Sequence, residues 1–502
     1  MLFTEDAVQI AQQIRGSHIS IVDTVQRALD NIDQYNPLLN AVTHTQYDAL
    51  DIAEAYQAKL DALSDDQKET LPPFYGVPIL LKDLGQTQAG QPSTSGSRLM
   101  KDFIAPITDN FVQQVLDAGF IVVGRTNTPE FGFKNESDSD FNGAVNHPMD
   151  LKRNPGGSSG GAAAALKAGL VPAVTASDGG GSIRIPASFT GLIGLKPTRG
   201  RMPVGPGGYR GWQGASIDFA ITRTVRDTWE MLKALQVEQT EAAFFCPKIA
   251  QQELTALDCP LNIAYTYDVP AGYALREEAR EALDQAVEQL KRLGHQLVEV
   301  PLPTDGRRAM ETYYMVNGVE TQVMMESIEQ GQQRKVTQDD MEPMSWALYR
   351  SGENVTGADY SRVLTYWDNL AVQMEQFFKE YDVLLTPTNN GAAFVHEEFH
   401  KQPEMVDRLH HIDDLSKAEQ QSLIWEMFDR SLEWTPFTQQ QNLTGQPAIS
   451  LPMYHTAQGL PIGIQAWGGR GEEYLLLQLA LQLEENGLLH TDIIDLSTQI
   501  NE

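Results

Sequence analysis

Cysteine and long apolar segments are both scarce in this chain. Cys246 and Cys259 are its only thiols among 502 residues, which argues against a disulfide framework and favours a reduced, cytoplasmic setting. Their spacing matches no metal-binding pattern, and the sequence predicts neither a metal ion nor a cofactor. No apolar run approaches the ~18 residues that a membrane-spanning helix needs. The N-terminus also lacks the basic segment and apolar core of a secretory signal, so we expect no association with a membrane.

Basic side chains are few, at 37 Lys and Arg against 67 Asp and Glu, for a net charge of −30. Binding to the phosphates of nucleic acids depends on clustered Lys and Arg. The composition therefore argues against a nonspecific nucleic-acid surface. A solvated acidic surface is the simplest interpretation, and the net charge does not constrain the fold.

Strand-like and helix-like patterns alternate along the chain. The apolar run 74–84 predicts a buried strand, and residues 261–300 form a strand–helix–strand pattern. Two more strands are expected at 447–453 and 460–467, joined by a turn near Gly459. Amphipathic helices are expected at 20–32, 48–63, 111–118, 277–293, 417–432 and 473–484. The alternation indicates an α/β protein.

Low-complexity linkers and internal repeats are absent. We therefore expect residues 1–502 to form one large domain. Helical patterns dominate about 310–381 and 392–434, which we interpret as helical insertions into that domain. No residue in them identifies a substrate group, although their position suggests that they shape a pocket.

The segment 153–187, RNPGGSSGGAAAALKAGLVPAVTASDGGGSIRIPA, carries the strongest chemical signal. It places Ser158 and Ser182 between glycines at either end of a short apolar stretch. Glycine beside serine is costly in backbone entropy. It is typical of a sharp turn, or of a backbone that directs N–H groups at a ligand.

Ser158 has several possible roles. Residues 156–160 satisfy G-x-S-x-G, the nucleophile elbow of α/β-hydrolases, but that elbow needs an apolar strand before it. Residues 146–155 are polar and interrupted by proline, which disfavours an elbow. A P-loop is excluded because no Gly-Lys-Ser/Thr follows the glycines. No serine has a lysine three residues later, which excludes a β-lactamase-like motif.

Ser182 follows a better-defined context. Residues 169–177 predict a strand, and Asp178 with three glycines then forces a tight turn. Consecutive glycines allow several N–H groups to converge on a developing oxyanion. Pro186 limits any helix after the serine. A purely structural turn remains the alternative at this point.

A nucleophilic serine needs a base. The histidines form no recognisable motif, and only His147 lies near the glycine-rich segment. Lys82 directly follows the apolar residues 77–81, where burial would favour a neutral amine. The same lysine could instead reach solvent or pair with Asp83.

Four motifs in this order resemble the amidase signature family: GVPILLKDL, GGSSGG, SDGGGSIRIPAS and GLKPTRGR. The resemblance extends from Ser20 to the last helix and includes RTNTPEFG and TGQPAISLP…GLPIGIQ. Residues 344–360, MSWALYRSGENVTGADY, with 445–465, are most similar to the subgroup of hydrolases acting on 6-aminohexanoate oligomers and cyclic dimers. The resemblance implies an α/β fold with a large mixed central sheet covered by helices on both faces.

The family's Ser–Ser–Lys triad maps onto Lys82, Ser158 and Ser182. The resemblance implies that Lys82 is the base, that Ser158 relays a proton and follows a cis peptide bond from Gly157, and that Ser182 is the nucleophile. The usual threonine before the aspartate is Ser177 here, which keeps the hydroxyl.

The resemblance also implies roles around the triad. The N–H groups of Gly179, Gly180, Gly181 and Ser182 would bind the oxyanion. Ser159 and Asp178 would support the loop, and Arg184 could pair with Asp178 or be exposed to solvent.

The implied activity is hydrolysis of a linear or cyclic amide C–N bond through an acyl-enzyme, on a small-molecule substrate. The alternative is the A subunit of glutamyl-tRNA(Gln) amidotransferase, which shares the triad and acts in a complex. A third possibility is a non-catalytic ligand-binding scaffold. The oligomeric state is open, with a homodimer as one candidate.

Overall fold

A single mixed sheet of eleven strands organises the protein, and the computed structural model describes residues 1–498. The strand order is β1-β3-β2-β4-β6-β5-β10-β11-β9-β7-β8. The strands are β1 (Val42–Thr45), β2 (Pro78–Lys82), β3 (Ile121–Thr126), β4 (Ala173–Asp178), β5 (Ile193–Lys196), β6 (Ile217–Thr222), β7 (Asn262–Tyr265), β8 (Gln296–Glu299), β9 (Val383–Pro387), β10 (Ala448–His455) and β11 (Pro461–Gly468). Strands β3, β2 and β4 are parallel neighbours, as are β9, β7 and β8, and the remaining pairs are antiparallel.

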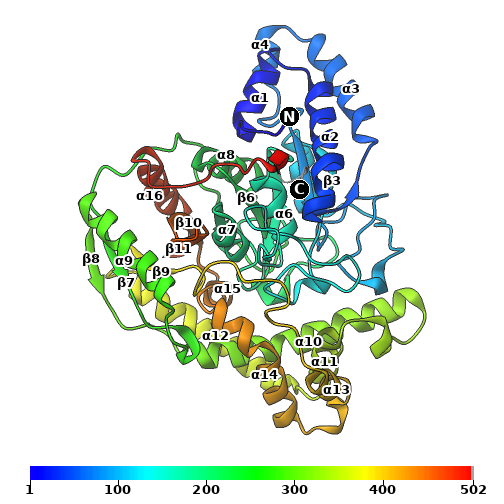
Figure 1. The fold of residues 1–502 in the computed structure, drawn as a ribbon, viewed down its shortest axis with the longest axis vertical. Coiled ribbons are helices and arrows are strands. Elements are labelled where there is room, and N and C mark those ends of the chain that lie inside the picture. Colours follow the sequence, from blue (N-terminus) through cyan, green and yellow to red (C-terminus); the bar gives the residue numbers. More distant parts are fainter. Residues whose placement is uncertain (499–502) are drawn as a thin grey trace.

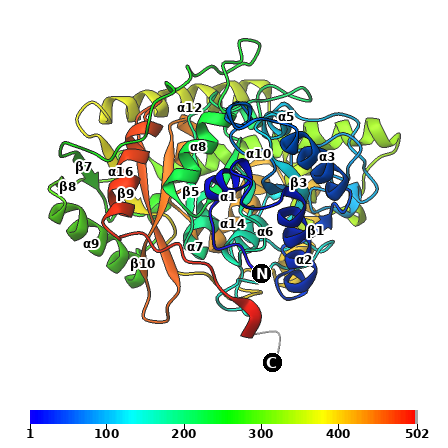
Figure 2. The ribbon, with the colours of Figure 1, turned by 90° about the horizontal axis from the view of Figure 1, so that it is seen from above.

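Helices cover both faces of this sheet, as expected (Figures 1 and 2). Helices α6 (Gly160–Lys167) and α7 (Arg184–Thr190) contact each other and pack on the central strands. Helices α8 (Val225–Leu235) and α16 (Glu473–Glu485) form a second contacting pair on β6 and on β10–β11. The other N-terminal helices are α1 (Ala7–Arg15), α2 (Ile21–Leu39), α3 (Ala49–Asp61), α4 (Asp65–Lys68) and α5 (Asn110–Asp117).

Local sequence signals account for several of these elements. Ser20 caps α2 by accepting a hydrogen bond from the Asp23 N–H, which satisfies one donor that the first helical turn leaves free. Helix α9 (Glu277–Arg292) joins the parallel strands β7 and β8, so the expected strand–helix–strand unit is confirmed. Strands β10 and β11 form the expected antiparallel pair, with Gly459 in the left-handed conformation at the turn.

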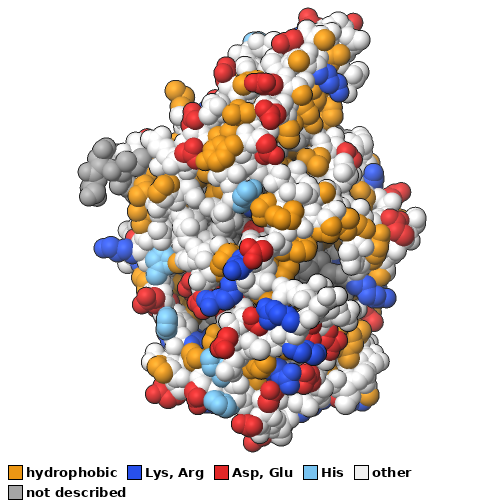
Figure 3. All heavy atoms as spheres, turned by 90° about the vertical axis from the view of Figure 1, so that its right-hand side faces the viewer, with side chains coloured by type: hydrophobic (Ala, Val, Ile, Leu, Met, Phe, Trp, Pro, Cys, Tyr) orange, Lys and Arg blue, Asp and Glu red, His pale blue; other side chains and the backbone are white. Residues whose placement is uncertain are grey.

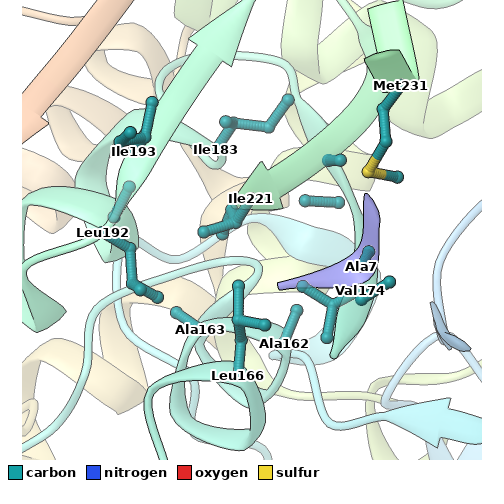
Figure 4. Close-up of a cluster of buried hydrophobic side chains, with 14 of the residues drawn as sticks. Ala7, Ala162, Ala163, Leu166, Val174, Ile183, Leu192, Ile193, Ile221 and Met231 are labelled. Atoms are coloured by element: carbon teal, nitrogen blue, oxygen red, sulfur yellow. The ribbon is translucent and has the colours of Figure 1, made fainter. Parts of the chain in front are cut away.

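The core around the central strands is built from small and branched apolar side chains. Ala162, Ala163 and Leu166 of α6 lie beside Val174 of β4 and Ile221 of β6 (Figure 4). The alanines let the helix approach the sheet closely, and interiors are packed at crystal-like density. Close packing here fixes the position of both ends of the glycine-rich segment.

The lower part of the molecule in Figure 1 is helical. It contains α10 (Gly306–Gln332), α11 (Pro343–Gly352), α12 (Gly357–Phe377), α13 (Pro403–His410), α14 (Lys417–Trp434) and α15 (Gln440–Thr444). Helices α10, α11 and α14 enclose their own apolar cluster, which includes Met310, Leu348 and Phe428. The helical character expected for these stretches is confirmed, whereas the division into one domain with insertions stays a prediction.

The distribution of charged side chains on the surface agrees with the low content of Lys and Arg. On the face in Figure 3, acidic and basic side chains are interspersed and form no continuous basic area. Cys246 and Cys259 are both free thiols. Within residues 1–498, no helix is long and apolar enough to cross a membrane.

Candidate active site

Two parallel strands end at the same edge of the sheet and bring the first site residues together. Strand β2 ends at Lys82 and its neighbour β4 ends at Asp178. The carboxyl ends of parallel strands meet where ligands bind in open α/β sheets. Residues far apart in the chain therefore share one location.

Lys82 is fully buried and lies within hydrogen-bonding distance of two hydroxyls. Its Nζ is 2.7 Å from Ser158 Oγ and 2.9 Å from Ser177 Oγ. Burial lowers the pKa of Lys82 from 10.5 to about 7, against the attraction of the Asp218 and Asp178 carboxylates. The amine is thus substantially neutral near pH 7, which a general base requires.

The alternative partners considered for the base are placed elsewhere. Asp83 accepts hydrogen bonds from the Thr94 N–H and hydroxyl, not from Lys82. The buried His147 ring is held by the Phe189 carbonyl at 2.8 Å and the Met149 N–H at 3.1 Å. Neither group faces the site.

Ser158 is positioned by an irregular segment and not by a nucleophile elbow. No strand directly precedes Ser158, and α6 begins two residues later at Gly160. The Gly157–Ser158 peptide bond is cis, as the resemblance implies. The next residue, Ser159, contacts strand β4: its Oγ lies 3.3 Å from the Ser177 carbonyl and 3.4 Å from the Ser177 N–H.

The glycine turn after β4 presents Ser182 and its neighbouring N–H groups. The N–H groups of Gly179, Gly180 and Ser182 have no acceptor among residues 1–498. The Gly181 N–H donates to Asp178 Oδ1 at 2.7 Å. Our expectation that Gly181 binds the oxyanion is therefore corrected, because its donor is already used inside the loop.

Asp178 and Arg184 form a buried ion pair beneath this turn. The Arg184 Nε and Nη2 donate to the two Asp178 oxygens at 2.9 and 2.8 Å, and both side chains are fully buried. Burial opposes ionisation of Asp178, but Arg184 and the hydrogen bonds from Arg184 and Asn442 outweigh it and lower its pKa to about 2. Solvent exposure of Arg184 is excluded, and the ion pair we considered is observed.

We expect loss of this ion pair to destabilise the fold. Arg184→Gln leaves the buried Asp178 carboxylate uncompensated and should lower the free energy of unfolding by about 3–5 kcal/mol. Urea denaturation measures this loss. The matched control is Arg408→Gln, which breaks an exposed pair with Glu426 and should cost less than about 1 kcal/mol. Equal losses in the two variants would contradict the prediction.

Two hydroxyls from distant segments hold the glycine turn in place. Tyr313 of α10 donates to the Gly179 carbonyl at 2.9 Å, and Thr438 donates to the Gly180 carbonyl at 2.9 Å. A bonded carbonyl fixes the orientation of its whole peptide plane. The two contacts therefore orient the N–H groups of Gly180 and Gly181.

The site opens into a cavity of about 520 Å³. Ser158, Ser177 and Ser182 are among its lining residues, and its walls are mainly apolar and aromatic. Within residues 1–498, Asp109 and Asp218 are the ionisable acids of the lining, and burial raises the pKa of both, that of Asp218 to about 7. The apolar walls include Phe131, Phe133, Trp212, Met310, Tyr314 and Phe428. A cavity of this size and character suits a small organic molecule with an aliphatic or aromatic part.

Sequence reasoning missed Tyr313, Thr438 and the second partner of Lys82. Ser177 and Thr175 are two residues apart in strand β4, so their side chains lie on the same face of the sheet. The Lys82 N–H donates to the Thr175 hydroxyl at 3.1 Å, which places this face against Lys82. That two-residue alternation was a readable signal. Tyr313 and Thr438 carried none, because they lie more than a hundred residues away in the chain. No cluster of metal ligands occurs in the described part of the chain.

Comparison with known proteins identifies the class. The pattern of the Amidase family matches residues 23–477. The chain is 38% identical to a lipoamidase of Enterococcus faecalis over 96% of its own length, but it spans only 63% of that relative. It is 31% identical to a 6-aminohexanoate-cyclic-dimer hydrolase of Paenarthrobacter ureafaciens over 96% of this chain and 94% of the relative.

A solved structure of a 6-aminohexanoate cyclic dimer hydrolase superposes with a TM-score of 0.85, at 30% identity and 97% coverage of both chains. Fold and sequence together define an amidohydrolase that acts on carbon–nitrogen bonds other than peptide bonds. The chain belongs to the amidase family, the one marked by the amidase signature. Its expected likeness to 6-aminohexanoate dimer hydrolases is confirmed.

Proposed function

We propose that this amidase cleaves its substrate through a Ser–Ser–Lys triad formed by Ser182, Ser158 and Lys82. One observation carries the proposal: a buried lysine with a pKa of about 7 lies 2.7 Å from Ser158 Oγ, and Ser158 and Ser182 line the same cavity. The proposed base, the relay hydroxyl and the second hydroxyl thus share one site.

The proposed chemistry proceeds by acyl transfer. Ser182 Oγ attacks the amide carbon while its proton passes to Ser158, whose own proton passes to the neutral Lys82. Collapse of the tetrahedral intermediate breaks the C–N bond, and the proton returns through Ser158 to the leaving amine. Water then attacks the ester on Ser182, and the carboxylic acid is released.

The developing oxyanion is stabilised by backbone donors of the glycine turn. Gly179, Gly180 and Ser182 have free N–H groups and line the cavity, whereas Gly181 does not line it. Preorganised donors are effective because they need no reorientation as charge develops. Asp178, Arg184 and Ser159 act as supports for this turn.

The Tyr313 and Thr438 hydroxyls, which donate to the glycine turn, should affect kcat more than KM. Tyr313→Phe frees the peptide that carries the Gly180 N–H, and we expect it to lower kcat about tenfold with little change in KM. Thr438→Val frees the peptide that carries the Gly181 N–H, which already donates to Asp178, and should have the smaller effect. Steady-state kinetics separates the two parameters. The control is Tyr366→Phe, since within residues 1–498 the Tyr366 hydroxyl donates only to the Asp305 carbonyl, at 3.4 Å, and its loss should leave both parameters unchanged. An effect confined to KM would contradict the proposal.

The substrate we propose is a small aliphatic amide, linear or cyclic, of the 6-aminohexanoate or lipoamide type. The names of the two relatives support this class, as does the apolar wall of the cavity. The tRNA-dependent amidotransferase alternative has less support, because the two relatives are named as a lipoamidase and as a cyclic-dimer hydrolase. A cytoplasmic location and a homodimer remain part of the proposal, the first supported by the two free thiols.

A panel of amides tests the proposed function. Purified protein is incubated with aryl, short aliphatic, lactam-derived and peptide amides, and the released acid and amine are quantified by mass spectrometry. We expect turnover of aliphatic amides and of lactam-derived dimers. Hydrolysis of glutamine only in the presence of a partner subunit would overturn the assignment in favour of the amidotransferase.

A further inference from the structure

A second cavity of about 1040 Å³ adjoins the catalytic one. Three apolar side chains, Met100, Met324 and Ile328, line both cavities. They are partly exposed and pack against the same small apolar cluster that contains Phe131. The boundary between the cavities is therefore made of flexible apolar side chains, and no charged group seals it.

The two cavities differ in charge. Within residues 1–498, the acidic side chains of the catalytic cavity are Asp109 and Asp218, and burial raises the pKa of both, that of Asp218 to about 7, so neither holds a full negative charge in the way an exposed carboxylate does. In the second cavity, Arg98, Lys101 and Arg334 face Asp102 and Asp340. The second cavity therefore has a net positive charge.

The cations of the second cavity are not equally available. Arg334 is bound to both oxygens of Asp340 at 2.8 and 2.9 Å. Lys101 lies 3.9 Å from Asp102, with both side chains exposed. The Arg98 guanidinium has no ion pair or hydrogen bond within residues 1–498. Arg98 is thus the cation that an incoming anion can bind.

Helix α10 runs along both cavities and gives the distance between them. Tyr313 marks the oxyanion turn, and Met324 and Ile328 follow on the cavity-lining face of the same helix. Eleven residues separate Tyr313 from Met324, which is about 16 Å along the axis. An extended chain covers about 3.5 Å for every three backbone atoms. An arm of roughly 14 atoms therefore reaches from the oxyanion turn to the boundary.

We propose that the second cavity is a subsite for the far end of an extended substrate, an unbranched aliphatic arm that ends in a carboxylate. The arm passes Met324 and Ile328, and Arg98 binds its terminus. This rests on the proposed amidase function and extends its proposed substrates from small aliphatic amides to amides that carry a long arm. A carboxylate terminus is favoured over an ammonium because the second cavity has a net positive charge and the Arg98 guanidinium has no partner within residues 1–498.

The test compares substrates of different arm length and terminus. The substrates form two series, one with the arm on the acyl side of the amide and one with the arm on the amine side. Each series contains three substrates: a two-carbon arm, a 16-carbon arm ending in methyl and a 16-carbon arm ending in carboxylate. The variants are Ile328→Trp, which blocks the boundary, and Arg98→Gln, which removes the charge. Val323→Trp is the control, since Val323 is 55% exposed on the same helix and lines neither cavity.

We expect the wild type to prefer the carboxylate-ended over the methyl-ended arm about 3- to 5-fold in kcat/KM, in one of the two series, as an exposed ion pair would give. Arg98→Gln should abolish this preference. Ile328→Trp should lower kcat/KM for the long arms at least about tenfold more than kcat/KM for the two-carbon substrate. If Ile328→Trp also loses activity on the two-carbon substrate, the subsite is tested by Arg98→Gln alone, through the preference for the carboxylate-ended over the methyl-ended arm.

The outcomes separate the two proposals. Turnover of the two-carbon amide with no dependence on Arg98 in either series overturns the subsite and leaves the amidase function intact. No turnover of any amide by the wild type overturns the proposed function itself.

Discussion

Ser182→Ala should abolish amide hydrolysis, with kcat falling by at least about 10⁴-fold. The nucleophile is the only group that forms a covalent bond to the substrate in the proposed mechanism, and no other residue replaces it. Ser182 is 7% exposed and lines the cavity. Removing that hydroxyl takes away no hydrogen bond within residues 1–498, so the fold should be unaffected.

The assay follows release of the amine from a substrate that the wild type cleaves, at enzyme concentrations high enough to detect residual turnover. Ser361→Ala, on the exposed side of α12, is the control and should retain full activity. Circular dichroism verifies that both variants are folded. Mass spectrometry of rapidly quenched wild type should show the acyl adduct on Ser182. Wild-type turnover by Ser182→Ala would sink the nucleophile assignment.

Lys82→Met should lower kcat/KM by roughly 10³-fold, the scale of general-base catalysis. Methionine keeps the length of the side chain in the buried site but cannot accept a proton. In the wild type, kcat/KM should rise as the pH increases through about 7, because only the neutral amine of Lys82 is active and its pKa is about 7. The variant should lose this pH dependence.

The same substitution should stabilise the protein, and the sign follows from linkage. The pKa of Lys82 is about 7 in the folded protein and 10.5 in its ordinary state, so the unfolded chain binds a proton that the folded chain releases between these values. Burial of Lys82 is therefore most costly below pH 7, and the cost disappears as the pH rises toward 10.5. The gain in unfolding free energy of Lys82→Met should be largest at low pH.

Lys167→Met is the matched control for these measurements. Lys167 is also buried, and its pKa is lowered to about 8, chiefly by burial. It donates to the Gly191 carbonyl at 3.3 Å and does not line the catalytic cavity. Its substitution should leave activity and the pH profile unchanged. A loss of activity equal to that of Lys82→Met would mean that burial of any lysine, not proton transfer, explains the effect.

Several strands and helices could be predicted from the sequence because they depend on local patterns. The strand at 74–84, the unit at 261–300 and the paired strands near Gly459 were all expected from periodicity and turn residues, and they form as expected. The order of the eleven strands was not readable. Strand β5 pairs with β10, about 250 residues away, and no local signal encodes such a partner.

The sequence by itself determined the family and the three residues proposed as the triad, because glycines flanking two serines and a lysine after an apolar run are local requirements of this chemistry. Only the tertiary structure decided which backbone N–H groups of the glycine turn have no partner within residues 1–498 and which side chains hold the turn. Asp178 uses the Gly181 N–H and binds Arg184, while Tyr313 and Thr438 hold the turn from distant segments. Hydrogen bonds between distant residues and the burial that lowers the pKa of Lys82 arise only when the chain is packed.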